Sequence, residues 1–162
     1  MTPAGQPLDG SELVLLAQVP KAGGRWKQVH FNMTIAERFF RVSPDAAPRV
    51  MLERVDGHGR LHEPVPRPLV LSDSNKNSKI EFEFGDLRDY PTGGVPLLLV
   101  VELDLRTFRY VLLTPGDDGY DAMLQLNREQ ASIGRGLPRI LTTLDEVELR
   151  WPACPLRFPR SD

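Results

Sequence analysis

The sequence has a single cysteine, Cys154, so it cannot form an internal disulfide, and it has no CxxC pair or His/Cys cluster typical of structural zinc sites. Long apolar runs are also absent. The longest that follows a proline covers residues 97–101, far short of the roughly 20 residues that span a bilayer. The N-terminal residues lack the basic start and apolar centre of a signal peptide. We therefore expect a soluble, cytoplasmic protein with no membrane partner.

The motifs of common enzyme classes are missing as well. There is no phosphate-binding P-loop, dinucleotide fingerprint, GxSxG elbow or HExxH helix. His58 and His62 flank a glycine-rich turn, where helical metal-ligand spacing does not apply, and Cys154 lies between two prolines without a nearby base. Glu102 and Asp104, two apart on an apolar strand, leave a small metal-dependent nuclease as an alternative. We predict no catalytic residue, metal or cofactor, and whether the chain belongs to an enzyme stays open.

The size and composition suit one globular domain. The chain has 162 residues, of which 41% are hydrophobic and 26% charged, so extensive disorder is excluded by composition. We expect a single domain over residues 1–162, with a core at about 12–151 and a proline-rich tail that lies along the surface or leads to a further domain.

Alternation of apolar and polar residues predicts many short strands. The clearest is 79–84, where Ile80, Phe82 and Phe84 fall on one face. Prolines 64, 66 and 68 restrict residues 64–68 to extended backbone at the edge of a sheet. Six more strands are expected at 12–19, 27–32, 50–55, 60–63, 95–103 and 108–113, with 95–103 and 108–113 forming a hairpin. The short apolar segments at 69–71 and 140–142 are further candidates.

Only short helices are indicated. Capping-box spacing at Thr34 and Thr143 predicts helices at 34–41 and from 143 to the proline at 152, and residues 118–126 fit a third. Long helices do not alternate with the strands, so a doubly wound parallel sheet is excluded. We predict a mainly β (α+β) fold, a mixed β pseudobarrel of about seven strands decorated by two or three short helices.

Charge is unevenly distributed along the chain. The formal net charge is −2, but residues 20–80 carry eleven Lys/Arg against six Asp/Glu, whereas residues 81–162 carry nine against fourteen. If folding keeps these segments apart, the molecule has a basic face that attracts polyanions. If folding intermixes them, the asymmetry disappears.

Two polar segments within the basic part are candidates for nucleic-acid contacts. Lysine and arginine suit phosphates and guanine, asparagine and glutamine can pair with adenine, and glycine allows close backbone approach. The first segment follows Gly23 and Gly24 and the second leads into the alternating strand. The candidate DNA-binding residues are Lys21, Arg25, Trp26, Lys27, Gln28, His30, Asn32, Ser74, Asn75, Lys76, Asn77, Ser78, Lys79 and Arg88.

The order of these features resembles a known family, the B3-like DNA-binding pseudobarrel that serves as the recognition or effector domain of type II restriction endonucleases of the EcoRII kind. The resemblance is carried by the Gly-Gly segment 23–29, the helix with paired aromatics at 35–40, the polar segment entering the strand at 75–85, and the apolar strand at 96–103. It covers roughly residues 12–113. The family's second arm is richer in arginine and has an acidic base reader, where this chain has asparagine and serine.

The resemblance implies two arms, at 21–30 and 74–79, that clamp the major groove of double-stranded DNA without cutting it. Phosphate contacts would come from Lys21, Arg25, Lys76 and Arg88, and base contacts from the polar residues around them. A nuclease domain, fused or associated, is a conceivable partner. The alternatives are the small nuclease at Glu102 and Asp104 and a β-barrel that binds another protein through its acidic half.

Overall fold

The structure is a computed structural model that describes residues 8–19, 28–41, 49–71, 77–83, 90–131 and 139–160. Within these residues the chain forms nine strands and three short helices. In chain order they are β1 (Leu13–Gln18), β2 (Gln28–Asn32), α1 (Met33–Arg38), β3 (Arg49–Val55), β4 (Val65–Pro68), β5 (Val70–Leu71), β6 (Asn77–Glu81), β7 (Leu97–Asp104), β8 (Thr107–Leu113), α2 (Tyr120–Gln130), β9 (Arg139–Thr143) and α3 (Leu144–Arg150).

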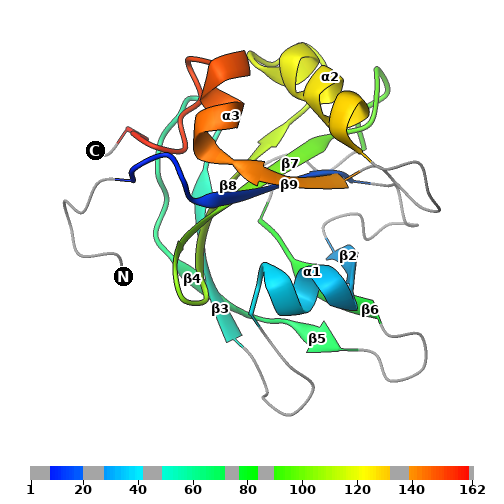
Figure 1. Cartoon of the computed structure of the whole chain (residues 1–162), viewed down its shortest axis with the longest axis vertical. Coiled ribbons are helices and arrows are strands. Elements are labelled where there is room, and N and C mark those ends of the chain that lie inside the picture. Colours follow the sequence, from blue (N-terminus) through cyan, green and yellow to red (C-terminus); the bar gives the residue numbers. More distant parts are fainter. Residues whose placement is uncertain are drawn as a thin grey trace.

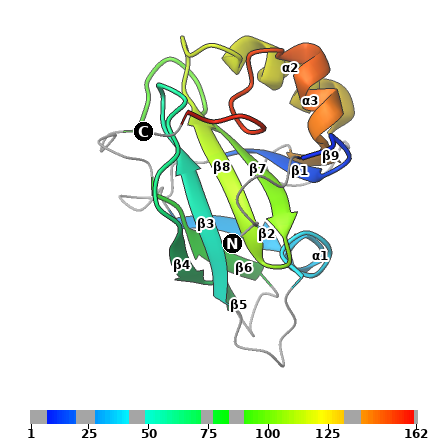
Figure 2. The same cartoon turned by 90° about the vertical axis from the view of Figure 1, so that its left-hand side faces the viewer.

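Six strands form one curved sheet in the order β4-β3-β8-β7-β1-β9 (Figures 1 and 2). All its neighbours are antiparallel except β3 and β8, which run parallel, so the sheet is mixed. The predicted hairpin of β7 and β8 is confirmed. The proline-rich strand β4 lies at the sheet edge, where a missing backbone N–H is tolerated.

A second, three-stranded antiparallel sheet has the order β2-β6-β5. Together with α1 it lies on one side of the large sheet, while α2 and α3 lie on the other (Figure 1). The large sheet is thus the middle of three layers. The layer with α1 carries the ends of both predicted arms.

Each side of the large sheet has its own hydrophobic core. Along β1, Leu15 faces the core shared with the second sheet and Leu16 faces the core shared with α2 and α3. Along β7, Leu98 and Leu99 alternate in the same way. These strands are buried on both faces, which explains why they read as continuous apolar runs without polar alternation.

The predicted mainly β, α+β fold class is confirmed, with nine strands in the described part against about seven expected. The return strand expected at 60–63 is reduced to an isolated antiparallel bridge between Val55 and Leu61. The segment does pair back with the end of β3, because the Asp56 N–H donates to the Arg60 carbonyl and the His62 N–H to the Arg54 carbonyl. The C-terminal tail adds a parallel bridge between Arg60 and Arg160.

The helix predicted at 34–41 begins directly after β2, at Met33, and ends at Arg38. Thr34 is therefore inside the first turn and not its cap. Thr143 is confirmed as the N-cap of α3, because its hydroxyl accepts a hydrogen bond from the Glu146 N–H over 3.3 Å. The tail does not simply lie along the surface, since Leu156 is fully buried in the helix-side core.

Candidate nucleic-acid interface

Six of the fourteen candidate residues lie on described strands. Gln28, His30 and Asn32 belong to β2, and Asn77, Ser78 and Lys79 belong to β6 rather than to a loop. The other eight lie outside the described residues and remain predictions: Lys21, Arg25, Trp26, Lys27, Ser74, Asn75, Lys76 and Arg88.

The two strands that carry these residues are hydrogen-bonded neighbours. In the antiparallel register His30 is opposite Lys79 and Asn32 is opposite Asn77. Directly opposite residues share a face of the sheet. The intervening pair, formed by Val29 and Ile80, is buried in the core. By alternation, positions 28, 30, 32, 77 and 79 therefore fall on the face away from the core.

Ser78 has a different position from its neighbours. It is opposite Phe31, which is buried, so alternation assigns position 78 to the inner face of the sheet. Of these three positions, 77 and 79 are therefore on the outer face of the sheet and 78 is not.

The register also fixes where each arm joins the sheet. Segment 20–27 leads into Gln28, which is opposite Glu81 at one end of the β2–β6 pair. Segment 72–76 leads into Asn77, which is opposite Asn32 at the other end. With about 3.4 Å per residue, the two attachment points are separated by roughly 14 Å along the strands.

Aromatic side chains anchor this sheet to the rest of the molecule. The Phe31 ring lies 5.4 Å from Phe40, which in turn is 5.0 Å from Phe108 in the large sheet. Directly after β6, the Phe82 ring packs edge-to-face against Tyr110 at 4.9 Å. The paired aromatics after α1 are thus core residues that hold the candidate interface in place.

The two carboxylates of the alternative nuclease pair have separate hydrogen-bond partners. Glu102 accepts a hydrogen bond from Arg41 Nε over 2.7 Å, which neutralises its charge. Asp104 lies beyond a register shift and accepts the Leu105 N–H over 2.7 Å at the hairpin turn. Within the described ranges, no group of three or more His, Cys, Asp or Glu residues is placed to hold a metal ion.

His62 and Cys154 have structural partners. The His62 ring lies 2.8 Å from Asp56, whose carboxylate also accepts the N–H groups of His58 and Arg60. Desolvation opposes ionisation of Asp56, but these hydrogen bonds outweigh it and lower its pKa to about 2. Burial raises the pKa of the Cys154 thiol to about 12, which makes it a poor nucleophile.

The helical layer is acidic. Helices α2 and α3 together carry five acidic and two basic residues: Asp121, Glu129, Asp145, Glu146 and Glu148, against Arg128 and Arg150. This layer lies on the opposite side of the large sheet from β2 and β6 (Figure 1). The net negative formal charge of the two helices would repel a polyanion from that side of the molecule.

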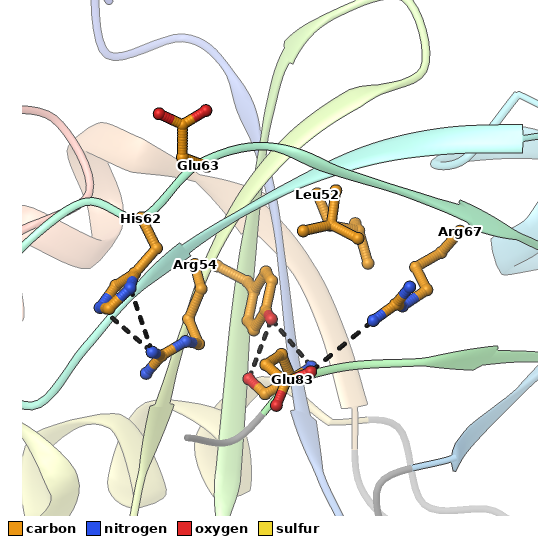
Figure 3. Close-up of a pocket in the computed structure, with 8 residues that line it drawn as sticks. Leu52, Arg54, His62, Glu63, Arg67 and Glu83 are labelled. Carbon is orange, nitrogen blue, oxygen red and sulfur yellow. Dashed lines mark hydrogen bonds and ion pairs between the residues drawn. The ribbon is translucent and has the colours of Figure 1, made fainter. Parts of the chain in front are cut away.

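The sequence patterns did not indicate a cavity between β3, β4 and the residues after β6, lined among others by Arg54, His62, Arg67 and Tyr110 (Figure 3). Its residues are distant in sequence and come together only through strand pairing. One feature of the sequence could have indicated this cavity. Val50 and Leu52 face the core, and the same alternation places the charged Arg54 at the next inward position of β3.

In the described part of the chain, no helix is long and apolar enough to cross a membrane. No protein-family model matches the sequence, and no curated protein matches it either. A solved structure, the N-terminal domain of Helicobacter pylori LlaJI.R1, has a similar fold with a TM-score of 0.54 and 12% sequence identity. The similarity covers 80% of this chain and 97% of that domain, so most of both chains share one arrangement of elements.

Proposed function

We propose that this chain is a B3-like domain that binds double-stranded DNA sequence-specifically, as the recognition part of a restriction system. The observation that carries the proposal is the pairing of β2 with β6, which joins the two polar segments in one sheet. The fold similarity to a domain of LlaJI.R1, a restriction-system protein, supports the same assignment.

The geometry suits a two-armed grip on the major groove. The arms join opposite ends of the β2–β6 pair, with attachment points roughly 14 Å apart. The major groove of B-DNA is about 12 Å wide. Two arms with this separation can contact the two groove walls while the polar positions between them face the base edges.

The candidate residues divide into phosphate contacts and base contacts. Lys21, Arg25, Lys76 and Arg88 would contact phosphates, which fixes orientation without reading sequence. Lys27, Gln28, His30, Asn75, Asn77 and Lys79 would contact bases. The acidic helical layer would face away from DNA, and cleavage would fall to a fused or associated nuclease.

The experiment that tests this function is a binding selection with a randomised duplex library at about 100 mM salt, followed by sequencing. A short enriched motif is expected. Enrichment of no motif would contradict sequence-specific recognition. Absence of any duplex binding at low salt would contradict DNA binding altogether and favour a protein partner.

A further inference from the structure

The two edges of the large sheet, formed by β4 and β9, differ in composition. Strand β4 has prolines at 66 and 68, which lack an N–H and so protect an edge against a further strand. Strand β9 has the sequence RILTT, without proline, lysine or an acidic residue. Within the described residues β9 pairs only with β1, and Figure 2 shows it at the outside of the molecule, with α3 above and α1 below.

Two hydrogen bonds determine which backbone groups of β1 face each neighbour. The Leu144 N–H donates to the Glu12 carbonyl on the β9 side, and the Val19 N–H donates to the Pro96 carbonyl on the β7 side. Antiparallel strands alternate between residue pairs that exchange hydrogen bonds and pairs that do not. Even-numbered residues of β1 therefore bond to β9, and odd-numbered residues bond to β7.

The register carries this alternation over to the edge strand. Ile140 and Thr142 are opposite even-numbered residues of β1, so their backbone groups bond to β1. The N–H and C=O groups of positions 139, 141 and 143 therefore point away from the sheet. In the described part of the chain, the backbone groups of Leu141 have no hydrogen-bond partner.

A row of outward N–H and C=O groups binds one chemical class of partner, a polypeptide in extended conformation. The outward positions of β9 are symmetric about Leu141. In antiparallel pairing of β9 with a copy of itself, the register centred on Leu141 is the one that pairs all five residues of the strand. We propose that two copies of this chain associate through their β9 strands in this register, which joins their large sheets into one.

The backbone groups suit this pairing. Each Leu141 N–H donates to the Leu141 carbonyl of the other copy. Each Thr143 N–H donates to the other copy's Arg139 carbonyl. The Thr143 carbonyl takes no part, because the carbonyl of an N-cap residue accepts the first hydrogen bond of its own helix.

The side chains opposite one another are compatible. Leu141 is half-buried and faces its own copy, which gives an apolar pair. Ile140 is opposite Thr142, and both are β-branched. Arg139 is opposite Thr143. No pair in this register brings like charges together.

The charge pattern favours a reversed copy of the same strand. At one end of β9, Arg139 forms no ion pair within the described residues. At the other end, Asp145 and Glu146 form the acidic first turn of α3. A strand with a basic start and an acidic continuation is complementary to itself when reversed. Since the prolines of β4 protect the opposite edge, the assembly closes at two copies.

The first test is sedimentation velocity of the full chain at concentrations up to about 500 µM. A five-residue strand pair is a small interface, so we expect a monomer–dimer equilibrium with a dissociation constant on the order of 10–100 µM. A monomer at every concentration would overturn the proposal. An assembly that grows beyond two copies would overturn it as well.

The second test changes the central residue. Leu141→Lys and Leu141→Glu each place like charges opposite one another and should weaken the dimer by at least about tenfold. Because position 141 meets itself in this register, an equimolar mixture of the two variants brings opposite charges together and should restore the dimer. Leu105→Lys, at the exposed tip of the β7–β8 hairpin, is the matched control and should leave the dimer unchanged. Loss of the dimer in Leu105→Lys, or wild-type association of either Leu141 variant, contradicts the proposal.

The third test needs no variant and decides the matter if the Leu141 variants fail to fold by circular dichroism. Amide hydrogen exchange of wild-type Leu141 is followed by NMR at low and high concentration. Exchange at Leu141 should slow by at least about twofold where the dimer forms, whereas Ile140 and Thr142 stay protected at both concentrations. Concentration-independent exchange at Leu141 would exclude the β9 interface even if a dimer forms. None of these measurements involves DNA, so their outcome is independent of the proposed function.

Discussion

Arg109 donates to the carboxylate of Glu53 over 3.1 Å, and the two residues are direct partners in the parallel pairing of β3 with β8. Their side chains are only 13% and 8% exposed. Arg109 also donates to the Leu156 carbonyl over 2.8 Å. One buried ion pair thus joins the two strands to the C-terminal tail.

We expect Glu53→Ala to destabilise the fold strongly, because it leaves the Arg109 charge buried without a carboxylate. The expected loss is roughly 3 kcal/mol in the free energy of unfolding, measured by urea denaturation. Glu129→Ala removes an exposed ion pair with Arg150 and should lose much less stability. Equal losses in the two variants would show that burial does not govern these pairs.

Asn77→Ala and Lys76→Ala should affect DNA binding differently. Position 77 shares the outer face of the sheet with position 32, so loss of its amide should reduce discrimination at one base pair by about 1–3 kcal/mol. Lys76→Ala should weaken cognate and random duplexes alike and reduce the salt slope by about one unit. Fluorescence anisotropy on both duplexes over a salt series measures the two effects.

Arg128→Ala on α2 is the matched control for these variants, because it removes a cation from the opposite layer. It should change neither affinity nor salt slope. If Asn77→Ala lost the same affinity on cognate and random DNA, Asn77 would contact the backbone and not a base.

The Asp56 carboxylate should make stability depend on acid. Its pKa of about 2 in the fold is below its ordinary value of 3.8, so the unfolded chain takes up its proton first as pH falls. The stabilisation is complete above about pH 4 and is lost as pH decreases towards 2. Asp56→Asn should be less stable than wild type at pH 6, and the difference should shrink at pH 3.

Urea denaturation at both pH values measures this difference, with Glu37→Gln on α1 as an exposed control. A gap between wild type and Asp56→Asn that stays constant from pH 6 to 3 would exclude the carboxylate as its source.

Cys154 should resist thiol reagents in the folded protein. Its pKa is raised from 9.0 to about 12, so the thiolate fraction at pH 8 is on the order of a thousandfold lower than in the unfolded chain. Labelling with a chromogenic disulfide should be slow in buffer and fast in urea. Rapid labelling without urea would show that the tail opens readily.

Local patterns in the sequence were sufficient to predict much of the fold. The alternation at Val29 and Phe31, and at Ile80 and Phe82, correctly predicted that these residues are in the core, although β6 ends at Glu81, one residue before Phe82. Phe84, predicted on the same face, lies outside the described residues. The prolines before residue 69 correctly predicted an edge strand. These signals succeed because one strand, its turn and its buried face are determined within a few residues.

Features that depend on distant contacts were not predictable. Nothing local in β3 indicates that it runs parallel to β8, or that the tail at Arg160 pairs with Arg60. For the candidate interface, the sequence indicated two polar segments. Only the pairing of Asn32 with Asn77 places their ends opposite one another in one sheet.

The large sheet separates two hydrophobic cores, so successive residues of its central strands pack in different cores. A volume change at Leu16 must be accommodated by α2 and α3, whereas the same change at Leu15 must be accommodated by the second sheet. The two sides can therefore accumulate substitutions almost independently. The helical side can be remodelled for a new neighbouring domain while the shape of the arm-bearing side is preserved.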